Sequence, residues 1–221
     1  MTKHRKTYDQ LRSARWFAPD DLRSFGHRSR MMQMGLSDED WEGKPVIAII
    51  NTWSDLSPCH HHLRDRAEQV KRGILQAGGL PAELPVHDFS EQFLKPTSML
   101  YRNMGALEVE ETLRSHPVDG VVLMGGCDKS TPALVMGAVS MGIPFIYMPA
   151  GAMLRGNYAG ETLGSGTDVW RYWDERRAGT VGKDTIDGVQ GGIARSYGTC
   201  MTMGTASTMM SIAEGFGLTL P

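Results

Sequence analysis

Short apolar runs, separated by polar loops and amphipathic segments, recur along the chain from about residue 44. Residues 46–50, 121–124 and 145–148 are almost continuously apolar, and a further short strand is expected within residues 82–91. Runs that are apolar at successive positions, rather than at every second one, are typical of strands buried on both faces of a parallel sheet. The pattern therefore predicts a central parallel sheet.

Helical periodicity fills the segments between these strands. Apolar side chains recur every three or four positions in residues 63–75, which end at a pair of glycines, and again in residues 98–115. Residues 131–142 follow the third strand, and a further helix is expected over residues 169–177. Alternation of strand and helix predicts an α/β fold, with helices on both faces of the parallel sheet.

The first 40 residues differ from the rest because they are charged and their apolar pattern is interrupted. We therefore divide the chain into an N-terminal helical and loop segment, residues 1–40, and an α/β domain, residues 41–221. The region from residue 151 onward is rich in glycine but contains neither GxGxxG nor GxxxxGK[ST]. Its motifs therefore do not indicate nucleotide binding.

Chemically active side chains follow three of the predicted strands. Cys59 follows the first strand, Glu91 the second, and the run Cys127, Asp128, Lys129 the third. Because the carboxyl ends of parallel strands meet at one edge of a sheet, these side chains should converge there. The sequence therefore predicts a metal-binding site at the carboxyl edge of the sheet.

Charge and hydropathy narrow the range of partners. The formal net charge is -2, so the chain has no strong basic footprint for nucleic acid or for an anionic membrane surface. The basic N-terminal residues lack the apolar core of a signal peptide, and the apolar runs are too short to span a bilayer. We expect a cytoplasmic protein with no nucleic-acid or membrane partner.

The chain has three cysteines, Cys59, Cys127 and Cys200. Their odd number and wide separation argue against a disulfide framework. They could be buried thiols that act as small hydrophobic groups, or three thiolate ligands of one metal centre. Structural zinc would need a fourth ligand, which one of the histidines at 60–62 could supply. An iron–sulfur cluster usually takes four cysteines, so three would leave one iron position open to a substrate hydroxyl.

The carboxylates beside the third strand have two interpretations. Hard oxygen donors such as Glu91 and Asp128 suit Mg²⁺, which binds one or two carboxylates and keeps positions open for substrate. Alternatively, Asp128 and Lys129 form a surface ion pair of little energetic value. The residues alone leave both interpretations open.

Three stretches resemble the cysteine segments of the dihydroxy-acid/6-phosphogluconate dehydratase family: NTWSDLSPCHHHL, GGCDKSTPALVMGA and GTCMTMGTASTM. The resemblance runs from about Arg15 onward. Three further stretches are similar to the sugar-acid branch, typified by L-arabinonate and D-xylonate dehydratases, more than to the branched-chain amino-acid enzyme: FGHRSRMMQMG, SEQFLKPTSMLYRN and GSGTDVWRYWDERRAG.

The resemblance implies two metal centres. The first is a [2Fe–2S] cluster held by Cys59, Cys127 and Cys200. The second is a Mg²⁺ ion whose ligands are Glu91, Asp128 and a carbamylated Lys129. A carbamate is an oxygen donor, whereas a free ammonium group cannot bind a cation. The resemblance also implies a homodimer or homotetramer that acts on a small-molecule sugar acid.

The implied activity is that of a hydro-lyase, which dehydrates a pentonate such as L-arabinonate or D-xylonate to a 2-keto-3-deoxy acid. Family members are longer, and their second, β-rich domain supplies a serine base that no residue of this chain matches. We therefore expect the 221 residues alone to be inactive. Two alternatives are a non-catalytic iron–sulfur or redox-sensing protein and a branched-chain dihydroxy-acid dehydratase.

Overall fold

A four-stranded parallel sheet forms the centre of the computed structural model, which describes residues 6–220. All neighbouring strands run in the same direction, in the spatial order β2 (Leu80–Pro85), β1 (Val46–Asn51), β3 (Gly120–Gly125) and β4 (Phe145–Pro149). The predicted α/β class with a parallel sheet is confirmed.

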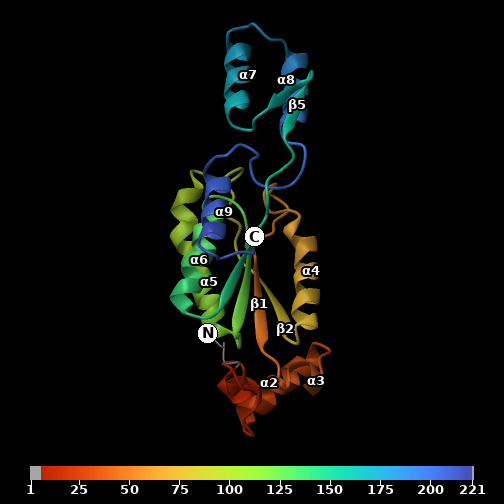
Figure 1. Ribbon diagram of the computed structural model, residues 1–221, viewed down its shortest axis with the longest axis vertical. Coiled ribbons are helices and arrows are strands. Elements are labelled where there is room, and N and C mark those ends of the chain that lie inside the picture. Colours follow the sequence, from red (N-terminus) through yellow and green to blue (C-terminus); the bar gives the residue numbers. More distant parts are fainter. Residues whose placement is uncertain (1–5, 221) are drawn as a thin grey trace.

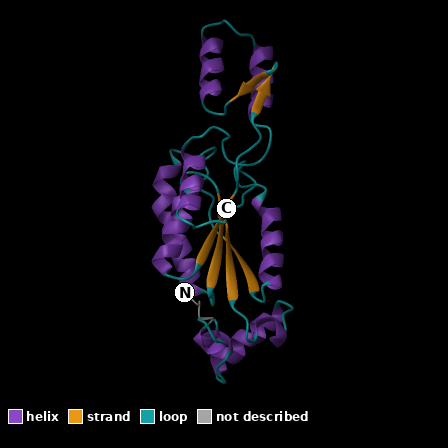
Figure 2. Cartoon of the chain, viewed as in Figure 1, coloured by secondary structure: helices purple, strands orange, loops and turns teal. Residues whose placement is uncertain are grey.

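Helices cover both faces of this sheet, as Figures 1 and 2 show. One face carries α4 (Leu63–Gln76), and the other carries α5 (Arg102–Ser115), α6 (Ser130–Met141) and α9 (Thr205–Gly215). A 3-10 turn, η2 (Ser98–Tyr101), leads into α5. None of the helices in the described part of the chain combines the length and apolar character needed to cross a bilayer.

Successive strand residues point to opposite faces of the sheet, which explains why their apolar runs are continuous. The core beneath α4 contains Ile49, Leu63, Ala67, Ile74 and Met124. The larger core beneath α5 and α6 includes Ile50, Val109, Leu113, Leu123 and Leu134. Full burial stabilises the fold by about 1.5–3 kcal/mol for each such side chain, so the sheet is held from both sides.

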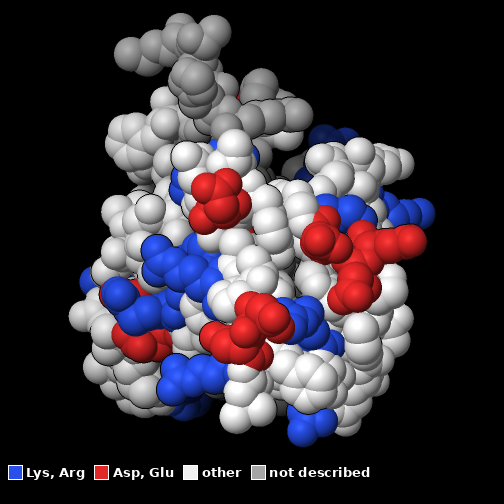
Figure 3. Space-filling model, turned by 90° about the horizontal axis from the view of Figure 1, so that it is seen from below, with Lys and Arg blue, Asp and Glu red and all other residues white. Residues whose placement is uncertain are grey.

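Short helices lie at the amino ends of the strands: α1 (Ala14–Phe17), α2 (Leu22–Gln33) and α3 (Asp38–Trp41), after a 3-10 turn, η1 (Tyr8–Gln10). The molecule is seen from this side in Figure 3, where basic and acidic side chains are interspersed over the visible face.

The N-terminal segment is joined to the sheet by both packing and hydrogen bonds. Phe17 of this segment, and Trp41 directly after it, are buried and belong to the same core as the strands beneath α5 and α6. Asp119, just before β3, accepts hydrogen bonds from the backbone of Ser13 at 2.9 Å and of Val46 at 2.8 Å. The segment therefore shares the core of the α/β body.

A small arm projects beyond the carboxyl ends of the strands (Figure 1). It consists of β5 (Gly156–Tyr158), β6 (Glu161–Leu163), α7 (Thr167–Arg177) and α8 (Lys183–Ile193). Its own core contains Leu163, Tyr172 and Val189.

Only α7 of the arm is predicted from the sequence. The strands β5 and β6 are three residues each, which is too short for a periodic signal. The glycines of α8 conceal that helix, because glycine lowers helix propensity. Gly188 is there for packing, since a Cβ at this position would lie 2.2 Å from the Tyr158 ring.

Candidate functional site

The segments that carry the three cysteines meet beyond the carboxyl ends of the strands. Cys59 lies in the loop after β1, Cys127 lies directly after β3, and Cys200 precedes α9. All three line a cavity of about 200 Å³, together with Glu91, Asp128, the residues just before α7 and the first turn of α9. Most of the side chains that the sequence places at this edge therefore line the same cavity.

Close backbone contacts hold these segments together. The backbone N–H of Gly198 donates to the carbonyl oxygen of Pro58 at 3.0 Å, which joins the segment of Cys200 to that of Cys59. Gly126 leaves no room for a side chain, because a Cβ there would lie 2.5 Å from Ala150 and 2.9 Å from Thr199. The glycines of the GGC and GTC motifs thus let three segments approach to backbone contact.

Two of the thiols interact directly. Cys59 and Cys127 are buried, and the neighbouring Cys127 thiol, with burial, raises the pKa of Cys59, while the Cys127 thiol donates to Asp128 Oδ1 at 3.4 Å. The adjacent Cys59 thiol lowers the pKa of Cys127, and the backbone N–H of Glu91 acts in the same direction. Thiolates rather than thiols bind metals, so both of these buried neighbours must lose a proton to become ligands. Cys200 is partly exposed on the same cavity.

Two carboxylates converge on one positive charge beside the thiols. The ammonium nitrogen of Lys129 lies 2.8 Å from Glu91 Oε1 and 2.5 Å from Asp128 Oδ2. Burial alone would lower the pKa of Lys129, but hydrogen bonds to Asp128 and Glu91 outweigh it and raise that pKa. The side chains of Lys129 and Asp128 are only 12% and 10% exposed, so this is a partly desolvated pair rather than a surface one.

Two hydroxyl groups in the cavity wall were not identified from the sequence. Ser165 Oγ and Thr202 Oγ1 are buried and have no hydrogen-bond partner within the described residues, and both residues line the cavity. Serine and threonine are common in any sequence, so these two can be identified only from their positions in the fold. Across residues 6–220, no three His, Cys, Asp or Glu side chains already stand close enough together to hold a single ion.

His60 has a different role from the zinc ligand that the sequence allowed. It is fully buried, and its Nε2 accepts hydrogen bonds from the backbone N–H groups of Gly126 at 2.9 Å and Cys127 at 3.1 Å. Its Nδ1 lies 2.6 Å from Asp88 Oδ1 and therefore carries the proton. Both ring nitrogens are occupied, so the expectation of a metal ligand is wrong for His60.

The other two histidines are placed differently. The ring of His61 stacks on Tyr197 with centroids 4.5 Å apart. His62 Nε2 lies 2.9 Å from the carbonyl oxygen of Ala150 and therefore donates to it, which leaves its buried Nδ1 without a partner in the described structure. None of the histidines at 60–62 lines the cavity of the cysteines.

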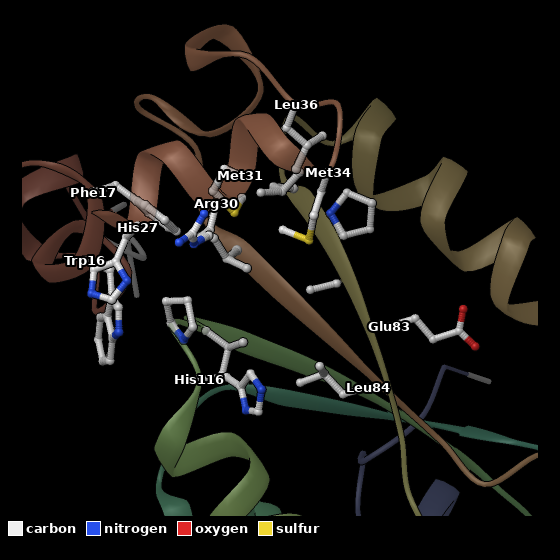
Figure 4. Close-up of a pocket in the computed structure, with 16 residues that line it drawn as sticks. Trp16, Phe17, His27, Arg30, Met31, Met34, Leu36, Glu83, Leu84 and His116 are labelled. Carbon is white, nitrogen blue, oxygen red and sulfur yellow. The ribbon is translucent and has the colours of Figure 1, made fainter. Parts of the chain in front are cut away.

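A larger hollow, of about 520 Å³, lies at the opposite end of the sheet (Figure 4). Its walls come from α1, α2, β2 and the segment that precedes β3, and most of them are apolar, including Trp16, Phe17, Met31, Met34 and Leu36. The polar side chains around it are His27, Arg30, Glu83 and His116. It contains neither thiols nor a pair of carboxylates, so size alone does not identify the chemical site.

The chain is similar to several curated proteins. It is 58% identical over 221 residues to 6-deoxy-6-sulfo-D-gluconate dehydratase of Pseudomonas putida, covering all of this chain and 38% of that protein. It is 47% identical over 215 residues to L-arabonate dehydratase of Azospirillum brasilense, and 42% identical over 218 residues to D-xylonate dehydratase of Caulobacter vibrioides. Each of these two matches covers 97% of this chain and 37% of the relative.

The chain therefore spans less than two fifths of the length of these relatives. Residues 44–221 match the family described as dihydroxy-acid/6-phosphogluconate dehydratase, N-terminal. The resemblance carried by the three cysteine motifs is thus confirmed over most of the chain. The chain belongs to the dihydroxy-acid/6-phosphogluconate dehydratase family.

Proposed function

We propose that this chain forms the metal-binding part of a sugar-acid dehydratase, which removes water from an aldonic acid to give a 2-keto-3-deoxy acid. The observation that carries the proposal is the cavity where three thiols and two carboxylates meet. Pentonates such as L-arabinonate and D-xylonate are candidate substrates. The name of the relative from Pseudomonas putida adds a six-carbon acid with a sulfonate group.

In this proposal Cys59, Cys127 and Cys200 hold a [2Fe–2S] cluster. Thiolates are soft donors, which iron–sulfur clusters prefer, and all three thiols line one cavity. Hard oxygen donors lie on the same cavity and suit Mg²⁺. When bound, the two metal centres supply Lewis-acid sites for the leaving hydroxyl and for the carboxylate end of the substrate.

The magnesium ligands in this proposal are Glu91, Asp128 and a carbamylated Lys129. Convergence of both carboxylates on the ammonium of Lys129 supports a site for positive charge at this position. For carbamylation the ammonium must first lose a proton. The neutral amine nitrogen then bonds to the carbon of carbon dioxide and releases a second proton, which leaves an anionic oxygen donor in place of a cation.

The reaction itself needs little rearrangement of the substrate. The acid loses the proton on C2 and hydroxide from C3, which together make water, and the resulting enol tautomerises to the 2-keto acid. No net electron transfer occurs. The hydroxyls of Ser165 and Thr202 are free to hydrogen-bond the substrate, and the amino ends of α7 and α9 favour its negative charge. The base, a serine in the family resemblance, is expected outside these 221 residues.

The test is an assay of the natural full-length protein purified without oxygen. Iron and sulfide are quantified, and the protein is incubated with L-arabinonate, D-xylonate, D-gluconate, 6-deoxy-6-sulfo-D-gluconate or 2,3-dihydroxyisovalerate, with and without Mg²⁺. We expect a 2-keto-3-deoxy product from at least one sugar acid, dependent on Mg²⁺, and none from residues 1–221 alone. Light scattering is expected to give a homodimer or homotetramer.

Other outcomes of the same assay separate the alternatives. Turnover of 2,3-dihydroxyisovalerate alone would assign the protein to the branched-chain enzymes. A reversibly reducible cluster with no product from any acid and no response to Mg²⁺ would indicate a redox-sensing protein, and the dehydratase proposal would then be wrong.

A further inference from the structure

A buried hydrogen-bond network, none of whose side chains lines the cavity, joins the loops that follow β1 and β2. The Ser57 hydroxyl donates to Ser90 Oγ at 2.9 Å, and the Ser90 hydroxyl donates to Asp88 Oδ2 at 2.7 Å. The backbone N–H of Ser90 donates to Asp88 Oδ1 at 3.0 Å, and the same oxygen accepts from His60. Ser57, His60 and Ser90 are all at most 2% exposed.

His60 extends this network to the third loop, the one that carries Cys127. Its Nε2 faces the backbone N–H groups of Gly126 and Cys127, while its Nδ1 faces Asp88 and, at 3.2 Å, the hydroxyl oxygen of Thr52. The Thr52 hydroxyl itself donates to the carbonyl oxygen of Met124 at 2.9 Å. One imidazole ring therefore links the loops after β1, β2 and β3.

We propose that His60, held by Asp88, is a positioning residue for Cys127, because it fixes the peptide groups from which the Cys127 side chain projects. The inference rests on the proposed function only in that Cys127 is taken as a cluster ligand. Both N–H groups are buried, so they need an acceptor, and His60, which does not line the cavity, supplies it.

The arrangement has an electronic consequence as well as a geometric one. Backbone N–H groups in a cysteine loop commonly donate to sulfur, and hydrogen bonds to cluster sulfurs change the reduction potential. Here two such groups are engaged by His60 instead. Without that acceptor they would be free to reorient, which would move the Cys127 sulfur and alter its hydrogen bonds.

The test compares variants of the natural full-length protein. His60→Leu fills the buried site with an apolar side chain and removes the acceptor. In His60→Gln, by contrast, the amide oxygen can still accept hydrogen bonds from both N–H groups. Asp88→Asn keeps the volume of the network but removes the charge that holds the His60 tautomer. His87→Leu is the matched control, because His87 is exposed next to Asp88 and its side chain takes no part in the network.

We expect His60→Leu to lose its cluster to a chelator about 10- to 100-fold faster than the parent, the usual effect of removing an outer-shell partner of a metal ligand. The electron paramagnetic resonance spectrum of its reduced cluster should shift, with a changed midpoint potential. His60→Gln should retain its cluster almost as long as the parent and give the parental spectrum. The rate of cluster loss from Asp88→Asn should lie between those of His60→Leu and the parent, and His87→Leu should match the parent.

A second readout does not need the cluster. In metal-free full-length protein, iodoacetamide alkylation of Cys127, followed by mass spectrometry, should be faster in His60→Leu than in the parent, and near parental in His60→Gln. If the parent binds no cluster, the proposed function fails, and the alkylation rates alone decide this inference.

Three results would overturn the inference: parental cluster retention and alkylation in His60→Leu, equal defects in the leucine and glutamine variants, or an equal effect in His87→Leu. If His60→Leu does not fold, the same comparison is made between Asp88→Asn and the parent. Parental retention, spectrum and alkylation in that variant then contradict the role of the pair.

Discussion

At the amino end of the sheet, side chains from α1, α2 and β2 surround an apolar hollow of about 520 Å³. At the carboxyl end, loops with thiols and carboxylates surround only about 200 Å³, and the imidazole of His60 is buried among the same loops. Apart from the hydrogen bonds to Asp119, the first end is held by contact between apolar surfaces, which depends little on direction. The second is held by hydrogen bonds with fixed donors and acceptors, so substitutions at the two ends should have different consequences.

The largest effect is expected from Cys127→Ser, which removes a thiolate at the carboxyl end. Serine is a harder donor and its hydroxyl stays protonated at neutral pH, so activity and cluster content should fall by more than about 100-fold, beyond the loss from an outer-shell change. Iron and sulfide analysis and the dehydratase assay measure this. A variant with parental iron content would remove Cys127 from the proposed ligand set.

Substitutions at the amino end of the sheet should change the free energy of unfolding rather than the cluster or the activity. Leu113 is fully buried in the core beneath α5 and α6, and Leu113→Ala should lower the free energy of unfolding by about 2–5 kcal/mol. At temperatures where the variant remains folded, its cluster spectrum should be unchanged. Urea unfolding and visible absorption separate the two effects, and an altered spectrum would show that the ends are coupled.

A smaller and more specific effect is expected from Glu91→Gln. Loss of one charged ligand, about 1.5–3 kcal/mol for an interaction of this type, should raise the Mg²⁺ concentration for half-maximal activity by about 10- to 100-fold. The iron content should stay parental. Magnesium titrations of activity check this, and an unchanged midpoint would place the ion elsewhere.

The smallest effect is a pH dependence within the His60 network. Burial favours the neutral form of Asp88, but hydrogen bonds to His60 and Ser90 outweigh it, so its pKa lies below the ordinary 3.8. Its contribution to stability is therefore complete above about pH 4 and is lost as the pH falls through the folded-state value.

At neutral pH, Asp88→Asn should accordingly be about 1.5–3 kcal/mol less stable than the parent, and this gap should narrow below pH 3.8. Urea unfolding between pH 7 and the lowest pH at which the parent folds measures the gap. A gap that stays constant over this range would mean that the charge of Asp88 contributes nothing.

The sequence predicts the sheet and its chemical edge because both depend on local patterns. The apolar strands are continuous, and Cys59, Glu91 and Cys127 each follow one of them. The hairpin β5–β6 and α8 could not be predicted, since strands of three residues and a helix with several glycines have no clear local signal.

The role of His60 was likewise beyond the sequence, for a different reason. In the run of histidines at 60–62 nothing distinguishes the first, and its function depends on N–H groups 66 and 67 positions away. Asp88 follows the second strand as Glu91 does, so its position alone weakly indicated a place near the site. Which carboxylate faces the cavity and which faces the network is decided by tertiary packing alone.

The neck of the arm has a further consequence for how such a protein can change. Ala152 and Thr199 form an isolated β-bridge, the N–H of Met153 donates to Thr199 O at 2.9 Å, and the N–H of Thr199 donates to Gly151 O at 2.9 Å. The chain thus leaves the body and returns through strands held side by side, and Cys200 directly follows this closure. Changes within residues 154–197 would therefore alter the cavity wall at Ser165 and Gly166, while the backbone bonds that place Cys200 lie outside that segment.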